Sequence, residues 1–330
     1  MGSNCVELHP GIYRIVLPMK GNRPGPVNAY LFAGKNVTLL DTGLAATGKV
    51  LLRALAEKGL SFEDIDQVVL THGHIDHFGA ARAIVKAGRG RAKVYAHTED
   101  VAAIERGYDT PPAAVSRFFR GAGMPALYRL AVRLLFSLFR FITPVCPVDV
   151  HLQDNDILHL GDYRGRVVST PGHSRGSICI HLEELDILFS GDHVLGHITP
   201  NAFVMLEEYH EIPRRMSQAE YYSSLARVEK ISPDTVYPAH GKAIHDLSSV
   251  TEGYRRSFRE RQEAILSVLG AEPMTVYAVA RALFPAIQGR RFVLEIFLAV
   301  SEVYTHLQIL ERDGRVACET SGGVEIYRAL

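Results

Sequence analysis

The heptapeptide THGHIDH at residues 71–77 directly follows the apolar run VVL at residues 68–70. Four of its seven side chains are imidazoles or a carboxylate: His72, His74, Asp76 and His77. Such groups are the usual protein ligands of zinc and related divalent ions. The apolar run is typical of a buried strand, whose end is a rigid place from which ligands point into a cleft. The stretch therefore predicts a metal site at the end of a β-strand.

The spacing within the motif predicts two metal positions. His72 and His74 are two residues apart, so in an extended segment both project to the same side and face one ion. Asp76 continues this alternation and His77 turns toward a neighbouring position, so this pair faces a second ion. Three further strand-like runs end at candidate ligands: His173, Asp192 and His240. An isolated histidine is more often an ordinary loop residue, but this many ligands at strand ends favours a metal centre.

The composition is that of an ordinary globular protein. The chain has 330 residues, enough for one large domain or two. Its 36 basic and 36 acidic side chains balance, which gives no overall attraction to nucleic acid or anionic membranes. The four cysteines form no C-x-x-C pair, so a reducing, cytoplasmic location is expected. Because no signal sequence and no long uninterrupted apolar stretch is evident, we expect a soluble protein without a membrane span.

The pattern of apolar residues predicts two domains. Short strand-like runs with Gly- and Pro-containing turns fill residues 6–43, and alternating strand and helix patterns continue to residue 248, as in layered α and β structure. Residues 249–330 instead predict helices followed by a hairpin with a Gly322-Gly323 turn. We therefore expect an α+β domain over residues 1–248 and a winged-helix-like domain over residues 249–330.

A segment at about residues 110–147 interrupts the first domain and is expected to form helices. It contains five arginines and no acidic residue between Thr110 and Val148. As a lid, the segment would offer Arg117 or Arg120 to an anionic substrate, such as a carboxylate or a phosphate. As a basic amphipathic surface it would contact a membrane, a partner or a second copy of the chain. As ordinary packed helices it would have no direct function.

Five short motifs resemble those of the metallo-β-lactamase superfamily, in its hydrolase branch with a complete two-metal ligand set, as in glyoxalase II. The matching pieces are LDTG at residues 40–43, THGHIDHFG at 71–79, TPGHS at 170–174, SGD at 190–192 and PAHG at 238–241. The resemblance covers roughly residues 8–245 and implies a four-layer αββα sandwich. The C-terminal domain resembles the winged-helix module that follows this domain in some family members, including a β-lactamase-like endoribonuclease.

The resemblance also implies the ligand set. The residues assigned by the family pattern are His72, His74 and His173 for one metal, Asp76, His77 and His240 for the second, and Asp192 as a bridge. Asp41 is expected to orient one of the ligands. The implied cofactors are two divalent metal ions. Zinc is the first choice, and iron or manganese also suits a set of nitrogen and oxygen ligands without cysteine.

Two neighbouring cations predict hydrolytic chemistry. They lower the pKa of a shared water, so a metal-bridging hydroxide is available near neutral pH to attack a carbonyl or phosphoryl centre. Asp76 borders both metals and is the candidate catalytic residue that orients the nucleophile and moves its proton. The predicted enzyme is a metal-dependent hydrolase of a small-molecule thioester, ester or lactone. The alternatives are a metal-dependent endoribonuclease whose tail guides RNA, and a DNA-binding sensor without catalysis.

The residues that select the substrate are less clearly marked. His193 and His197 follow Asp192 and are either pocket residues or loop histidines with backbone partners. The best-known β-lactamases have cysteine at the position of Asp192, which argues against that activity. Lactone hydrolases of the family carry a tyrosine shortly after the bridging aspartate. Here Tyr209 would substitute only if its loop folds back.

The charge of the C-terminal domain argues against nucleic acid as a partner. Residues 251–330 contain ten basic and ten acidic side chains. Binding to a phosphate backbone normally requires a basic excess. We therefore expect a structural or dimerisation role for this domain, with a homodimer as one option. The expected partner is a small-molecule substrate, for which an anionic group is one option.

Overall fold

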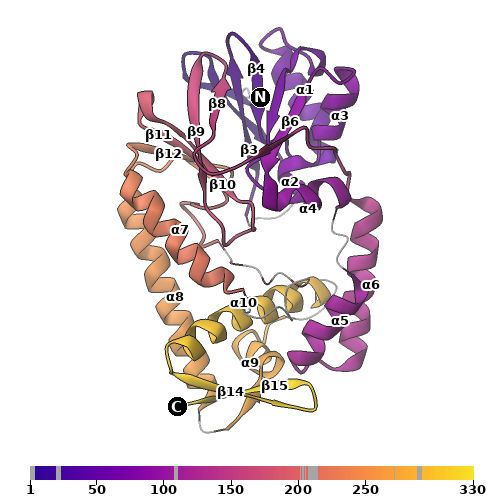
Figure 1. Ribbon diagram of the computed structural model, residues 1–330, viewed down its shortest axis with the longest axis vertical. Helices are drawn as coiled ribbons and strands as arrows, with labels where there is room; N and C mark the ends of the chain where they lie inside the picture. The colour runs from indigo at the N-terminus through magenta and orange to yellow at the C-terminus, as the bar shows by residue number, and fades with distance from the viewer. Residues whose placement is uncertain are drawn as a thin grey trace. The chain divides into compact units, whose positions relative to one another are not determined.

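The computed structural model describes residues 4–19, 24–107, 111–200, 215–270, 272–287 and 292–330, together with residues 202, 204 and 206. The chain divides into two compact units. The first comprises Met1–Gly107, Thr143–Pro200 and Ser224–Thr251, and the second comprises Tyr108–Ile142, Asn201–Ser223 and Glu252–Leu330. Figure 1 gives the labels of the helices and strands.

Two β-sheets form the centre of the first unit. The strands of the seven-stranded sheet, in spatial order, are β1 (Cys5–His9), β2 (Ile12–Leu17), β3 (Val27–Ala33), β4 (Val37–Leu40), β5 (Gln67–Val69), β6 (Lys93–His97) and β7 (Val150–Leu152). Those of the five-stranded sheet are β12 (Thr235–Pro238), β11 (Ile187–Gly191), β10 (Ile178–Leu182), β9 (Tyr163–Ser169) and β8 (Ile157–Leu160). Strands β4 to β7 pair in parallel, as do β11 and β12.

Most helices of the first unit follow the parallel strands. The short ones are η1 (Ala45–Thr47), η2 (Phe62–Asp64), α2 (Ile75–Phe78), η3 (Thr98–Asp100), α4 (Val101–Arg106) and η4 (Glu183–Leu185). The longer helices α1 (Gly48–Ala56) and α3 (Ala81–Ala87) bury Leu51 and Ile84 in a core shared with β3 and β5. The helices α7 (Ser217–Ile231) and α8 (Leu247–Leu269) have residues in both units.

A second core lies between the two sheets. Phe189 of β11 is fully buried, and its ring centre lies 4.7 Å from that of Tyr30, 5.3 Å from that of Phe32 and 5.4 Å from that of Tyr237. Tyr30 and Phe32 belong to β3 of the other sheet. The aromatic contacts therefore fix the two sheets face to face. The predicted α+β class is confirmed, with layered sheets and helices.

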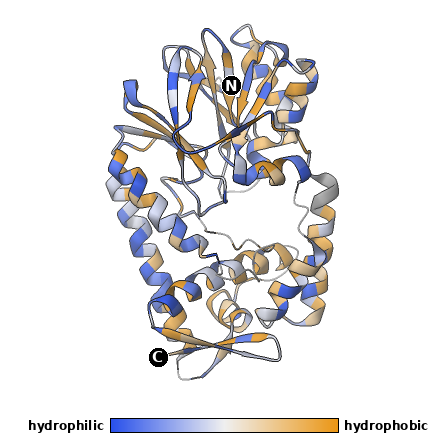
Figure 2. Cartoon of the chain, viewed as in Figure 1, coloured by the Kyte–Doolittle hydropathy of each residue, from blue (hydrophilic) through white to orange (hydrophobic). Residues whose placement is uncertain are grey.

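The second unit is mostly helical. It contains α5 (Pro112–Gly121), α6 (Ala126–Ile142), α9 (Val276–Leu283) and α10 (Phe292–Arg312). Its three-stranded sheet has the order β13 (Met274–Thr275), β15 (Val324–Ala329), β14 (Val316–Ser321). The hairpin of β14 and β15 turns at the predicted Gly322-Gly323 pair. The part of α8 that belongs to this unit is largely hydrophilic in Figure 2.

The helices predicted at residues 110–147 belong structurally to the second unit. Phe118 of α5 stacks edge-on against Tyr304 of α10, with ring centres 5.4 Å apart. Phe136 of α6 packs edge-on against Phe297 of α10, with ring centres 5.1 Å apart. The domain predicted over residues 1–248 includes this segment. Its apolar residues instead share a core with α9 and α10, because those helices supply the complementary apolar faces.

Among the described helices, α10 alone has the length and hydropathy that a membrane span requires. Of its most apolar window, 67% is buried inside the protein, as in the core helix of a soluble domain. This helix contributes Ile296, Val300, Val303 and Leu307 to the core of the second unit.

Replacing Phe189 by alanine is expected to lower the free energy of unfolding by about 3–5 kcal/mol, because it removes two aromatic contacts between the sheets, with Tyr30 and Phe32, and one within its own sheet, with Tyr237, and leaves a cavity. Urea denaturation followed by circular dichroism measures the change. Val6→Ala is the control, since Val6 is 43% exposed and its truncation is expected to cost under about 0.5 kcal/mol. Equal losses in the two variants would contradict the assigned role of Phe189.

His306 of α10 is expected to make the second unit sensitive to acid. Burial, and then the charge of Arg261, lowers the pKa of His306 from 6.5 to about 4. Between pH 6.5 and pH 4, His306 is therefore protonated in the unfolded chain but not in the folded protein. The contribution of His306 to stability is complete above that pH and is lost on acidification to pH 4, by about 3 kcal/mol in total.

The variant His306→Leu is expected to show a smaller loss of unfolding free energy than the wild type between these two pH values. Urea denaturation at a series of pH values gives the comparison. His151→Leu, at an exposed position of β7, is the control and should follow the wild type. Parallel curves for His306→Leu and the wild type would refute the assignment.

Candidate metal centre

The predicted ligands lie where strands end. The chain leaves β5 after Val69, and a loop with His72 and His74 leads into α2. His74 is the last extended residue before this helix, with φ −86° and ψ 145°. Asp76 and His77 therefore lie on a helical turn. The predicted alternation thus ends at His74 and does not extend to Asp76, because the helix begins at Ile75.

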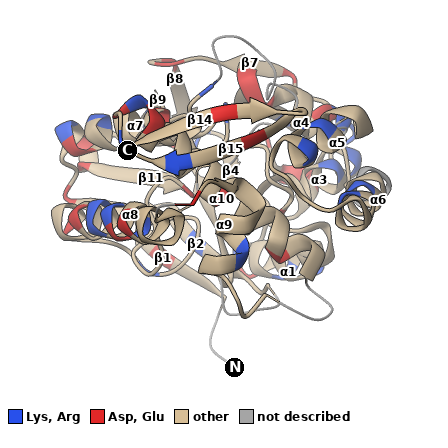
Figure 3. Cartoon of the chain, turned by 90° about the horizontal axis from the view of Figure 1, so that it is seen from below, with Lys and Arg blue, Asp and Glu red and all other residues tan. Residues whose placement is uncertain are grey.

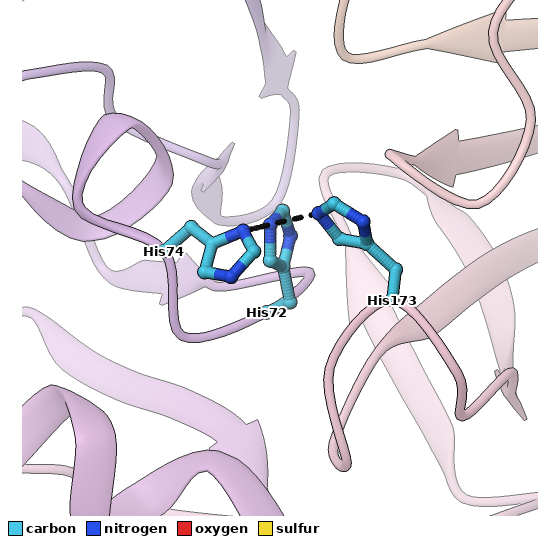
Figure 4. Close-up of side chains that lie close together, drawn as sticks. All are labelled: His72, His74 and His173. Carbon is cyan, nitrogen blue, oxygen red and sulfur yellow. Dashed lines mark hydrogen bonds between the residues drawn. The ribbon is translucent and has the colours of Figure 1, made fainter. Parts of the chain in front are cut away.

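Three histidines form the first group of candidate ligands. The Nε2 atom of His72 lies 2.9 Å from Nδ1 of His74, and Nε2 of His173 lies 3.0 Å from the same atom (Figure 4). His173 comes from the loop after β9, so residues far apart in the sequence converge here. Tetrahedral zinc with bonds of about 2.0–2.1 Å has its ligand atoms roughly 3.3 Å apart. The three nitrogens therefore suit one shared cation.

The second group combines carboxylates and imidazoles. The Nε2 atom of His240 lies 3.6 Å from Oδ2 of Asp76, and Nε2 of His77 lies 3.8 Å from Oδ1 of Asp76. Asp192 lies between the groups. Its Oδ1 is 3.6 Å from Nε2 of His77 and 3.5 Å from Nε2 of His240, while its Oδ2 is 3.5 Å from Nε2 of His173. One carboxylate thus faces both groups.

Several of these atoms lack the partners that buried polar atoms normally have. The Nε2 atoms of His77 and His240 and Oδ1 of Asp192 are buried and make no hydrogen bond. Both nitrogens lie near that oxygen at distances too long for hydrogen bonding. Buried polar atoms without a partner are costly and rare. A cation among them would satisfy all three, so the residues fit the metal ions that the family pattern implies.

The charges of the site favour metal binding. Burial, together with the neighbouring His77, lowers the pKa values of His72 and His74, so these imidazoles are neutral. Burial raises the pKa of Asp76, but the charge of His77 and the nearby imidazole of His240 outweigh this effect and lower it to about 2. Against the effect of burial, Asp41 and Asp192 raise the pKa of His77 well above its ordinary value. A cation would replace that proton, since ligands must be deprotonated.

Asp41 forms a hydrogen bond with the ring of His77, the candidate ligand nearest to it. Its Oδ2 lies 2.8 Å from Nδ1 of His77, which leaves Nε2 of the ring directed into the site. The same carboxylate accepts hydrogen bonds from the backbone nitrogen and the hydroxyl of Thr71, at 2.9 and 2.8 Å. Asp41 has a positive φ of 60°, which is uncommon for a residue other than glycine and marks a backbone constrained by the site.

Asp100 is a supporting residue that our sequence analysis missed. Its buried carboxylate accepts hydrogen bonds from the Gly73 nitrogen at 2.7 Å, the Gly176 nitrogen at 2.8 Å and the Ser174 hydroxyl at 2.6 Å. It therefore ties the loop of His72 and His74 to the loop of His173. The feature of the sequence that could have indicated Asp100 is its position three residues after the end of β6, at the same sheet edge as the metal motif.

The proposed substrate contacts have different environments. His193 is buried, and its pKa is lowered to about 3 by burial and then by His173. His197 is exposed, and its Nε2 donates to the Pro24 carbonyl at 2.8 Å, as expected of a loop histidine with a backbone partner. Tyr209 lies outside the described residues. Arg117 and Arg120 are exposed on α5 in the second unit.

Comparison with known proteins identifies the class. Residues 22–240 match the sequence pattern of the metallo-beta-lactamase superfamily, and this match covers more than half of the chain. The protein therefore belongs to the metallo-β-lactamase superfamily and is a hydrolase. The predicted family and enzyme class are confirmed.

Two relatives carry names of hydrolases. The "Probable metallo-hydrolase YqjP" of Bacillus subtilis is 26% identical over 312 residues, which are 93% of this chain and 94% of that protein. The "Atrochrysone carboxyl ACP thioesterase" of Aspergillus fumigatus is 26% identical over 320 residues, 92% of this chain and 61% of that protein. This chain thus spans less than two thirds of the thioesterase.

Solved structures show the same fold over nearly the whole chain. The metallo-beta-lactamase family protein TTHA1429 from Thermus thermophilus has a TM-score of 0.79 and 28% identity, and the match covers 98% of this chain and 100% of that one. A beta-lactamase domain protein from Burkholderia ambifaria has a TM-score of 0.80 and 23% identity, and the match covers 99% of this chain and 93% of that one. At that identity the second match shows the fold alone.

Replacing Asp100 by asparagine is expected to weaken zinc binding roughly 10- to 100-fold, because an amide cannot accept from three donors and its NH₂ group would face one of them. Titration of the metal-free protein with zinc against a chromophoric chelator measures the affinity. Ser174→Ala, which removes one of the three hydrogen bonds of Asp100, should lose less zinc affinity than Asp100→Asn does.

The matched control is Asp149→Asn. Asp149 also accepts from a backbone nitrogen, that of Val94 at 2.9 Å, but it contacts neither ligand loop. Its zinc affinity should equal that of the wild type. If both aspartate variants lost affinity equally, or neither did, Asp100 would not position the ligands.

Proposed function

We propose that this protein is a dinuclear metal-dependent hydrolase that acts on a small-molecule thioester, ester or lactone. One observation carries the proposal. The Nε2 atoms of His77 and His240 and Oδ1 of Asp192 are buried without hydrogen bonds, and the two nitrogens lie 3.6 and 3.5 Å from that oxygen. These atoms adjoin the group of His72, His74 and His173, to which Asp192 presents its other oxygen.

The assignment of ligands follows the three groups of converging atoms. We assign His72, His74 and His173 to one ion, Asp76, His77 and His240 to the other, and Asp192 to both. When bound, two such ions supply Lewis acidity and a water of lowered pKa. Zinc is our first choice, and iron or manganese suits the same nitrogen and oxygen donors.

Asp76 is the proposed catalytic residue. Its side chain is 19% exposed, whereas those of His77 and His240 are fully buried, so it is the member of its group that a substrate or water reaches. With a pKa of about 2 the carboxylate stays ionised at neutral pH. It therefore accepts a hydrogen bond from the attacking water and orients its lone pair. The proton passes to the leaving group and is not retained on Asp76.

A small-molecule substrate is supported by charge and by one relative. Residues 251–330 carry as many acidic as basic side chains, which does not favour a phosphate backbone. The relative named as an acyl carrier protein thioesterase supports a thioester. Within the proposal the protein is cytoplasmic, and the glyoxalase II-like ligand set needs no further cofactor.

A metal-dependent ribonuclease is the second candidate. The arrangement of α8, α9, α10 and the hairpin of β14 and β15 favours a winged-helix module over residues 249–330, as we propose for this domain. In that case the module would guide RNA to the same metals. We prefer a structural or dimerisation role for it because its charge is balanced.

The proposal is tested by metal analysis and turnover together. Protein purified without added metal is expected to contain close to two ions per chain, and His173→Ala should lose at least one. The variant Asp76→Asn should lose at least about a hundredfold in kcat on the thioester or ester that the wild type hydrolyses. His151→Ala, at an exposed histidine of β7, is the control and should keep both ions and full activity.

The substrates are a panel of thioesters, esters and lactones beside single-stranded RNA. Cleavage of RNA alone, abolished in Asp76→Asn, would replace the first candidate by the second. Wild-type protein without detectable metal would refute both.

A further inference from the structure

Helix α6 exposes a row of leucines on one face. Leu127, Leu130, Leu134 and Leu138 have exposed fractions of 74%, 45%, 54% and 61%. Their spacing of three, four and four residues places them along one side of the helix. Val132 is fully buried in the core of the second unit, so the leucine row is directed away from that core. Exposed leucines occur singly on many proteins, but a continuous row marks an interaction surface.

Arginines border this leucine row. Arg129 and Arg133 of α6, with Arg120 of α5, line an open groove between the two helices. Ser116 and Ala126 complete its walls, together with Leu130, which also belongs to the leucine row. The groove and the apolar row are therefore one continuous surface, which we call the arginine–leucine face.

The charge of this face is unbalanced. Residues 111–148 contain five arginines and no acidic residue, although the whole chain has no net charge. Figure 3 shows basic and no acidic positions on α5 and α6. Among the residues that the structure describes, no acidic side chain forms an ion pair with Arg120, Arg129 or Arg133. With respect to the described residues, these three guanidinium groups are available to an external anion.

We propose that the arginine–leucine face docks the protein on an anionic phospholipid surface. The arginines contact lipid phosphates through charge-assisted hydrogen bonds, and the leucines enter the boundary between headgroups and acyl chains. Helix α6 has 17 residues with arginines along its length, so it lies in the plane of the interface and does not cross the bilayer. This binding is independent of the proposed hydrolysis.

A lipid surface fits better than a second copy of the chain. In a symmetric dimer the same face would meet itself. Arg129 and Arg133 would then approach the same arginines of the other copy, with no acidic residue of α5 or α6 to pair with them. An anionic bilayer offers both the charge and the apolar phase that this face lacks.

The test uses the full chain and sedimentation with vesicles of phosphatidylcholine, alone or mixed with phosphatidylglycerol. The protein is expected to sediment with the mixed vesicles and much less with the neutral ones, and added salt should weaken binding. The double variant Arg129→Gln/Arg133→Gln and the single variant Leu134→Asp should each bind at least about tenfold more weakly.

Helix α1 provides matched controls. Leu52 and Arg53 are exposed there, and Leu52→Asp and Arg53→Gln should bind as the wild type does. Circular dichroism checks that each variant is folded.

Three results would overturn the proposal. The first is equal binding to neutral and anionic vesicles, and the second is equal losses in the α1 and α6 variants. The third is a dimer, seen by light scattering, that Leu134→Asp dissociates while no vesicle binding is found. That result would assign the face to a second copy.

Discussion

The candidate metal centre depends on a fold that holds together buried ligand atoms that cannot satisfy one another. Each buried polar atom without a partner costs about 1–3 kcal/mol, and a charged one costs more. Oδ1 of Asp192 is one such atom, and Nε2 of His77 and Nε2 of His240, 3.6 and 3.5 Å from it, are two more. A chain free to relax would turn these side chains away from one another. The surrounding fold must therefore hold these side chains in place, and the stability of the fold maintains their arrangement.

Two carboxylates supply much of that support by binding the backbone. Asp41 fixes the start of the motif through both the nitrogen and the hydroxyl of Thr71, and it fixes the ring of His77 through Nδ1. Asp100 joins the loops of the three-histidine group through Gly73, Gly176 and Ser174. Gly176 must be glycine for this contact, because a Cβ atom there would lie 2.7 Å from the Asp100 nitrogen. Small residues and carboxylates thus bring distant loops into one site.

The sequence predicted those parts of the site in which the signal is local. Alternating apolar runs ending in histidine or aspartate were sufficient for the α+β class and for the groups around His72 and Asp76. Asp100 was missed because its partners are two backbone nitrogens and a hydroxyl from segments remote in sequence, which no spacing reveals. The segment at residues 110–147 was predicted to be helical from its periodicity. The core that these helices share with α9 and α10 was not predicted, because the periodicity of apolar residues does not show which other element covers the apolar face of a helix.

The charge of the metal centre limits what can occupy it. Asp41, Asp76 and Asp192 bring three carboxylates into a buried region where His72 and His74 are neutral. Without a cation, only the raised pKa of His77 and that of His240 offset this negative charge, by retaining protons. The Nε2 atoms of both rings face Asp192, and a nitrogen that binds a metal must be unprotonated. Protons and divalent ions therefore compete for the same atoms, and the carboxylates that raise the pKa of His77 also strengthen the attraction for the cation that displaces its proton.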